Sequence, residues 1–454
     1  MIKKSIGKLI RSFNKEKHIA PLAVLRMAFG LIMLISTIRF IARGWIREFY
    51  VAPKFYFPFY GFEWIKPLPE TGMYMVFAVM VVASFFILIG FLYRLSIISF
   101  FVCFVYVELI DKTYYLNHYY FVSIISFLML LVPAHRYFSA DVIRKPSLKV
   151  TRVPGWMINI FKWQLCLVYF FAGISKLNYD WMIAAMPLKL WLPANAGLPI
   201  IGVLLKQTWV AYIFSWFAAF FDLTISFFLL YAPTRKIAYV FVLVFHVFTG
   251  WLFKIGMFPY IMIFVTVIFF SESFHLRLIQ FLRDLFNKRS EQINEIPVSL
   301  QLTPLAKKLL YPLLTGFVLL QLLVPFRYLL YPGKLFWTEE GYRFSWRVML
   351  MEKGGISFFY IKDHRSGRKW EVINSEFLTP LQERMMQTQP DMMLQYAHHL
   401  HDVYDSRGIK DPIVTVESYV TLNGSGSRLY IDSSIDLAKQ KESFLSKKWI
   451  MPFH

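Results

Sequence analysis

The chain has 454 residues, of which 57% are hydrophobic and only 17% are charged, and its formal net charge is +21. A soluble chain carries about a quarter charged residues, so this composition indicates a polytopic membrane protein and excludes an ordinary soluble enzyme. The basic residues stand in short runs between apolar segments, as in the cytoplasmic loops of membrane proteins. We therefore expect no nucleic-acid partner despite the positive charge.

Nine apolar segments predict an α-helical membrane bundle of about nine spans. They lie at approximately 21–41, 72–92, 95–112, 115–133, 156–176, 209–231, 237–253, 257–271 and 306–329. Residues 1–18 are basic and lack a short apolar core with a cleavage site, so we interpret them as a retained cytoplasmic tail. The excess of basic residues in alternate loops places the N-terminus in the cytoplasm and the segment after the ninth span outside. The absence of disulfide cysteines favours a plasma (inner) membrane.

Two predicted outer loops are rich in aromatic residues and proline. The first covers residues 43–70, and the second, residues 182–208, contains the stretch KLWLPANAGLP. Such loops anchor a protein in the membrane interface. They could also roof a pocket that opens to lipid, and the sequence leaves both interpretations open.

Charged residues become frequent after Pro332, which predicts an extracytoplasmic α+β domain at 331–454 and a transmembrane domain at 1–330. The stretch SFFYIKDHRSGRKWEVIN predicts a β-hairpin with an Arg-Ser-Gly turn. IVTVESYVTLNGSGSRLYIDSS predicts a second hairpin that turns at Asn-Gly-Ser-Gly. The region between them has a helical pattern, with Pro390 as a break.

Ionisable side chains inside or beside the spans are candidate functional groups, because each costs free energy unless it is paired or has a function. Lys176 ends an apolar segment, where it is either an interfacial anchor or a reactive amine in a dry pocket. Asp222 and His246 lie within spans, and for Asp222 we expect a structural ion pair with a basic residue of a neighbouring helix. Asn117 and His118 lie at the outer rim, where they could contact a quinone-like ring or form a hydrogen-bonded turn between helices.

No metal site is expected. Cys103 and Cys166 both lie in apolar runs and lack the spacing of zinc ligands. His398, His399 and His401 are close in sequence, but neighbouring histidines point in different directions on a helix.

Five motifs occur in register along the chain: DKTYYLNHYYF, AGISKLNYDW, FDLTISFFLLY, FHVFTGWLFKIGMFPY and WTEEGYRFSW. In these motifs the chain resembles the vitamin K-dependent γ-glutamyl carboxylases, whose membrane part is also called the HTTM domain. The resemblance runs from the first span to the final hairpin. The chain is shorter than expected of the animal enzymes, which favours a bacterial homologue.

The resemblance implies that Lys176 is the base that acts first on the reduced vitamin, and that His118 assists at a later quinone stage. Further residues that we expect to contact substrate or cofactor are Asn117, His246, Trp337 and Trp346, and Ser345 matches a family motif without an assigned role. As a base, Lys176 would have to be neutral. Burial among apolar side chains would have to lower its pKa, by about 2–3 units from the usual value near 10.4.

The implied reaction is that of a carboxylase, a carbon–carbon lyase, which couples conversion of a quinol to its epoxide with carboxylation of protein glutamate. Its cofactor would be reduced vitamin K or menaquinol, with O2 and CO2 as co-substrates and no metal. Its partners would be a Glu-containing protein or peptide and the membrane lipid that carries the quinone.

Two alternatives remain open. Ser175 stands where the animal enzymes have a second lysine, and no region that would bind a propeptide is apparent. The chain could therefore be a quinol epoxidase or oxygenase that does not carboxylate. The other alternative is a non-enzymatic membrane scaffold or transport protein in which Lys176 is only an anchor.

Overall fold

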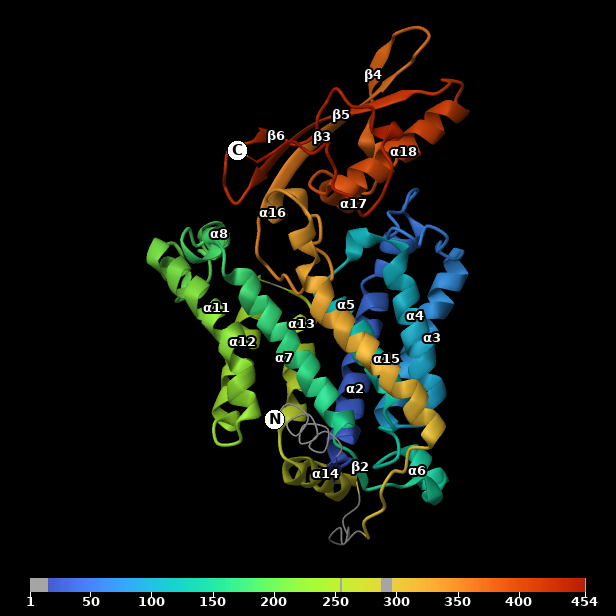
Figure 1. Cartoon of the computed structure of the whole chain (residues 1–454), viewed down its shortest axis with the longest axis vertical. Coiled ribbons are helices and arrows are strands. Elements are labelled where there is room, and N and C mark those ends of the chain that lie inside the picture. Colours follow the sequence, from blue (N-terminus) through green and yellow to red (C-terminus); the bar gives the residue numbers. More distant parts are fainter. Residues whose placement is uncertain (1–14, 254, 287–295, 454) are drawn as a thin grey trace, which may run out of the picture.

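The computed structural model describes residues 15–253, 255–286 and 296–453. Apolar helices form an elongated bundle, and a mixed α/β domain from the C-terminal quarter of the chain covers one end of it (Figure 1). Residues 1–14 of the expected cytoplasmic tail lie outside the described residues.

Within the described residues, the bundle consists of ten longer helices with short connecting elements. The longer helices are α2 (Ala20–Ala42), α3 (Glu70–Ile89), α4 (Tyr93–Ile110), α5 (Asn117–Leu131), α7 (Trp156–Lys176), α11 (Thr208–Leu230), α12 (Arg235–Phe253), α13 (Phe258–Thr266), α14 (Glu272–Phe286) and α15 (Pro304–Leu323). The short helices of this part are α6 (Ala140–Arg144), α8 (Tyr179–Met182), α9 (Leu188–Trp191) and α10 (Gly202–Leu205). At the end remote from the C-terminal domain, β1 (Glu16–His18) pairs antiparallel with β2 (Arg152–Pro154).

All nine segments predicted as spans are helical, but their count as spans is approximate. In the described part of the chain, seven helices are long and apolar enough to cross a membrane. An eighth span results if the bent pair Phe258–Phe269 and Glu272–Leu285, whose helices meet at 116°, is counted as one. The ninth predicted span is α5, an apolar helix of only 15 residues.

Close helix packing in the bundle depends on small residues and on buried polar groups that are satisfied internally. A Cβ on Gly30 of α2 would lie only 2.4 Å from the backbone nitrogen of Leu88, so glycine allows α2 and α3 to touch. Arg26 of α2 is fully buried, and its guanidinium donates hydrogen bonds to backbone carbonyls. The acceptors are the carbonyl oxygens of Ile87, Leu88, Ala134 and Phe138.

The C-terminal domain contains both predicted hairpins. Its sheet has the order β4-β3-β5-β6, with neighbouring strands antiparallel. The strands are β3 (Lys353–Lys362), β4 (Lys369–Glu371), β5 (Ile413–Leu422) and β6 (Arg428–Leu429). Alternate residues of β5 are buried, as a sheet with one covered face requires.

The helices of this domain are α16 (Leu335–Thr338), α17 (Pro380–Met386) and α18 (Pro390–Ser406). Pro390 occupies the first turn of α18, where proline is favoured because its missing N–H has no helical partner. The predicted break at this residue is confirmed. The fold class is therefore the predicted one, a helical membrane bundle with a C-terminal domain that contains β-hairpins.

The domain is fixed to the bundle by buried polar contacts at the connection between α4 and α5. Lys112 Nζ lies 2.8 Å from a carboxylate oxygen of Asp391 in the first turn of α18. Asp111 accepts a hydrogen bond of 2.9 Å from Gln382 Nε2 of α17. The ends of several bundle helices that face this domain share one apolar core with it. The division at residues 330 and 331 stays a prediction.

Candidate functional site

Lys176 is the last residue of α7, and it is buried. Its Nζ donates 3.2 Å to the carbonyl oxygen of Ala172 and lies 2.7 Å from Asp222 Oδ2. The same nitrogen lies 5.4 Å from the centre of the Trp181 ring. An interfacial anchor would extend its ammonium into water, so this environment is that of a functional or structural buried amine.

Close packing of α7 against α11 brings Asp222 to Lys176. A Cβ on Gly173 would lie 2.9 Å from the backbone nitrogen of Leu223, and only glycine permits this approach. Asp222 is itself buried. The two ionisable groups thus form a pair that is shielded from water within the bundle.

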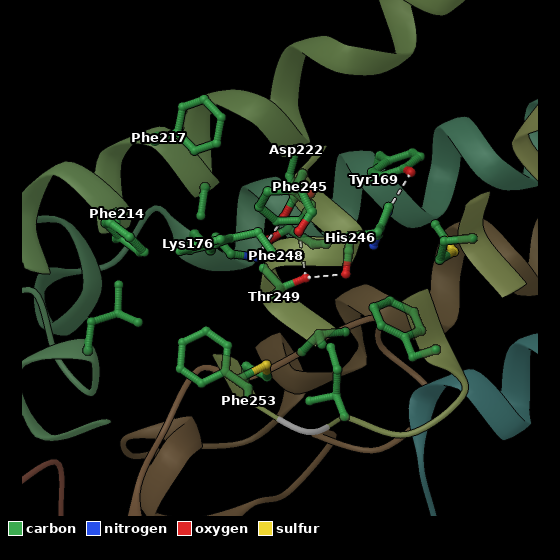
Figure 2. A pocket seen from close by; sticks show the side chains of 18 of the residues that line it. Tyr169, Lys176, Phe214, Phe217, Asp222, Phe245, His246, Phe248, Thr249 and Phe253 are labelled. Atoms are coloured by element: carbon green, nitrogen blue, oxygen red, sulfur yellow. Dashed lines mark hydrogen bonds and ion pairs between the residues drawn. The ribbon is translucent and has the colours of Figure 1, made fainter. Parts of the chain in front are cut away.

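Lys176 and Asp222 line a cavity of about 280 Å³ with mostly apolar walls (Figure 2). It is called here the apolar cavity. Its aromatic lining consists of Trp181, Trp191, Phe214, Phe217, Phe245, Phe248, Phe253 and Phe258. On the side of α11 and α12, lining residues Ile213, Phe217 and Val244 are also exposed on the apolar outer surface. Two lining residues, Leu188 and Trp191, come from the predicted outer loop at 182–208.

His246 of α12 lines the same cavity and has one free ring nitrogen. Its Nε2 lies 3.0 Å from the hydroxyl oxygen of Tyr169, a contact visible in Figure 2. Its Nδ1 is buried and has no hydrogen-bond partner among the described residues. A buried polar atom without a partner costs free energy, so Nδ1 is an unsatisfied polar atom on a residue that lines the cavity.

A second, polar cavity of about 860 Å³ lies between the bundle and the C-terminal domain. Asn117 and His118 line it, whereas neither lines the apolar cavity. Its cationic lining residues are Arg39, Arg43, Lys112, Arg343, Arg347, Lys353 and Arg384, and its acidic ones are Glu339 and Glu352. The polar cavity is therefore strongly positive.

The two cavities share part of their walls. Ile255, Phe258, Val348 and Met349 line both of them, and they are called here the septum. The Phe258 ring lies between the two histidines, with its centroid 5.9 Å from that of His118 and 5.7 Å from that of His246. The predicted site histidines thus belong to different cavities on either side of one aromatic ring.

The segment 339–349 forms one wall of the polar cavity in an irregular conformation. Phe344, Trp346 and Met349 have positive φ angles of 60°, 59° and 54°, which non-glycine residues rarely adopt. The segment is fixed to the bundle because Asn117 Nδ2 donates 2.7 Å to the carbonyl oxygen of Arg347. Strained backbone of this kind is concentrated at functional sites.

The two predicted tryptophans are packing residues in this arrangement. Trp346 is buried and stacks on Tyr120 with the ring centroids 4.8 Å apart. Trp337 is buried in the C-terminal domain, where its Nε1 donates 2.7 Å to the carbonyl oxygen of Met451. Ser345, also buried, donates to the carbonyl of Tyr342. The assignment of Trp337 and Trp346 to substrate or cofactor binding stays a prediction.

The three histidines of α18 make separate contacts. His398 Nε2 lies 2.7 Å from the carbonyl oxygen of Gln440, and His399 stacks on Phe55. His401 lies beside two surface carboxylates. Within the residues that the structure describes, no group of three His, Cys, Asp or Glu side chains could hold a metal ion.

Sequence reasoning missed Arg39, Tyr169 and Phe258. Arg39 stands in the last turn of α2, and an arginine inside an apolar segment was a usable signal. Tyr169 and Phe258 occur among many other aromatic residues of the spans. Nothing in the sequence separates them from packing residues.

Comparison with protein families supports the family resemblance that the sequence motifs indicate. The family model of the HTTM domain matches residues 14–274. The model of the vitamin K-dependent gamma-carboxylase lumenal domain matches residues 306–454. No solved structure matches the chain. With both of its characteristic domains present in order, the chain belongs to the vitamin K-dependent gamma-carboxylase family.

Proposed function

We propose that this protein couples the oxygenation of a reduced quinone to the carboxylation of glutamate in a protein or peptide. The quinone is reduced vitamin K or a menaquinol, O2 and CO2 are co-substrates, and the quinone leaves as its epoxide. The observation that carries the proposal is the buried Lys176–Asp222 pair on the wall of an apolar cavity that shares its septum with a positive cavity.

The residues of the apolar cavity fit a quinone ring. Aromatic side chains offer flat apolar surfaces, and the partnerless Nδ1 of His246 and the Lys176–Asp222 pair offer polar contacts for ring oxygens. The lining residues exposed between α11 and α12 give an isoprenoid tail a route to lipid. When bound, the reduced vitamin supplies a phenolic proton and the electrons that reduce O2.

Lys176 and Asp222 would act together as the base that takes this proton. A base must be neutral before it accepts a proton, so the proton of the pair would have to reside on Asp222 Oδ2, 2.7 Å from Lys176 Nζ. Burial penalises the two separated charges and thereby reduces the advantage of the ionised pair. Lys176 Nζ can then accept the phenolic proton, and Asp222 orients the amine for the transfer.

The remaining residues would position groups and exclude water. Tyr169 would fix the orientation of the His246 ring through its contact with Nε2. Residues of the septum and of the loop at 182–208 line the apolar cavity, and they would close it toward the aqueous side. A strongly basic species survives only where water is absent, which is the physical reason for placing such chemistry in a membrane.

We further propose that the protein is a multi-pass plasma (inner) membrane protein with a cytoplasmic N-terminus and an extracytoplasmic C-terminal domain. The loop charges favour this orientation. The polar cavity would then be reached by an exported substrate protein.

One assay tests the proposal against its alternatives. Purified protein in detergent is supplied with reduced vitamin K, O2, labelled bicarbonate and a glutamate-rich peptide. Epoxide together with label in the peptide supports the carboxylase, and epoxide alone supports an oxygenase that does not carboxylate. Neither product would contradict both enzymatic functions and favour a scaffold or transport role.

The same assay tests the base. Lys176→Ala should abolish epoxide formation, and a small primary amine that enters the cavity should restore part of it. Lys206→Ala is the matched control, because Lys206 is exposed and lines neither cavity. Full activity of Lys176→Ala would contradict the assignment.

A further inference from the structure

The polar cavity has more positive charge than its own carboxylates neutralise. Lys353 pairs with Glu339 at 2.8 Å, and Lys112 and Arg343 both contact Asp391. Glu352 accepts a hydrogen bond from the Trp191 indole. The carboxylates at the cavity are thus engaged, and its remaining arginines face the space without a partner of opposite charge among the described residues.

Two of these arginines, Arg39 and Arg347, have a buried Nε with no hydrogen-bond partner among the described residues. Arg347 packs on the Tyr328 ring at 4.3 Å, and Arg39 stands in the last turn of α2. The Arg39 guanidinium lies over the Trp45 ring at 5.5 Å, which holds the side chain by a cation–π contact. None of the ion pairs in the described part of the chain involves Arg39, although Arg is the residue best suited to a bidentate carboxylate contact.

The position of Arg39 is next to the septum. Gly256 stands directly before Met257 and Phe258, where α13 begins. A Cβ atom on Gly256 would lie 4.0 Å from Arg39 Nη2. Arg39 also lines the same cavity as His118, which packs against Phe258. A carboxylate bound by Arg39 would therefore lie at the end of the polar cavity that adjoins the apolar cavity.

We propose that Arg39 binds the side-chain carboxylate of the substrate glutamate and presents its γ-carbon to the septum. This inference rests on the proposed function and assigns the acidic peptide to the polar cavity. Arg43, one helical turn further along and lining the same cavity, adds positive charge at the entrance.

Direct binding tests the inference without any turnover. A fluorescent peptide rich in glutamate and its glutamine counterpart are titrated against the full-length protein in detergent, and fluorescence anisotropy is measured. Wild-type protein should bind the glutamate peptide at least tenfold more tightly, with a preference that falls as salt is added. Equal binding of the two peptides by the wild type would overturn the inference even if no variant could be produced.

Arg39→Gln should lose most of this preference while binding the glutamine peptide as the wild type does, and Arg39→Lys should keep part of it. Arg47→Gln is the matched control, because Arg47 is exposed just beyond the same helix and lines neither cavity. An undiminished preference for glutamate in folded Arg39→Gln would overturn the proposal.

The result is separate from the test of the proposed function. If the wild type formed neither epoxide nor carboxylated peptide, the proposed function would fail whatever the binding data. If the wild type carboxylated the peptide but Arg39→Gln kept its preference for glutamate, only the role of Arg39 would fail.

Discussion

At the scale of single residues, the pairing of Lys176 with Asp222 decides what the lysine can do. A lone buried amine would only need to lose its proton, whereas a paired amine exchanges a proton with its partner over 2.7 Å. Removing one member of a buried ion pair costs about 3–5 kcal/mol, because the other charge is left uncompensated. Replacing both by apolar groups of similar volume is often neutral.

We therefore predict different effects of single and double substitutions at this pair. Asp222→Ala should lower the melting temperature in detergent and reduce epoxide formation by about 100-fold or more, as loss of a proton-transfer group does. The double variant Lys176→Met with Asp222→Leu should regain the melting temperature but form no epoxide. Epoxide formation by the double variant would show that the pair has only a structural role.

The sequence directs attention to Lys176, Asp222 and His246 because each is an ionisable residue inside an apolar segment, and the structure gathers all three around one cavity. The same rule also selects Arg26, which only binds backbone carbonyls. His118 shows the limit of the method, since its position in the polar cavity depends on how α5 packs against α13 and the segment 339–349. Sequence spacing contains no information on that packing.

At the scale of elements, the beginning of α13 matters because it contributes Phe258 to the septum between the two cavities. This helix is short, because the chain bends by 116° before α14 begins. Phe258 is its first residue. Lengths and apolar runs predict the nine apolar helices of the described bundle, whereas α14 lies in a stretch that was not predicted to be a span. The bend was not predicted, because the sequence of a short polar break does not indicate the angle between the two helices that it joins.

Phe258→Ala should join the apolar and polar cavities and admit water to the base. We expect the amount of labelled carboxylate per epoxide to fall several-fold, because a reactive intermediate would then be quenched by water. The measurement is the ratio of the two products in one reaction. Phe264→Ala is the control on the same helix, because Phe264 is 40% exposed and lines neither cavity; an unchanged ratio in Phe258→Ala would argue against the septum.

At the scale of the whole molecule, one ionic network joins the C-terminal domain to the bundle. Burial by itself raises the pKa of Asp391, but Arg343 and Lys112 outweigh this effect and hold the pKa below its usual value. A carboxyl with a depressed pKa in the folded state stabilises that state fully above its unfolded pKa, about 3.9, and loses this contribution as the pH falls below it. The sequence could not foresee the contact, because Lys112 and Asp391 are far apart along the chain.

We predict that Asp391→Asn loosens the domain from the bundle and flattens the acid dependence of stability. Its melting temperature should be lower at pH 7, because Lys112 is left buried without its closest carboxylate. Between pH 5 and pH 3, the melting temperature of the wild type should fall more steeply than that of the variant. Asp402→Asn, on the exposed side of the same helix, should behave as the wild type.

The proposed orientation of the whole molecule can be tested by labelling single cysteines in intact cells. Ser433, in the C-terminal domain, and Ser147, at the opposite end of the bundle near α6, are both exposed. In a background without Cys103 and Cys166, a membrane-impermeant maleimide should label Ser433→Cys directly and Ser147→Cys only after the membrane is opened. The reverse pattern would place the polar cavity on the cytoplasmic side, and an exported protein could then not be the substrate.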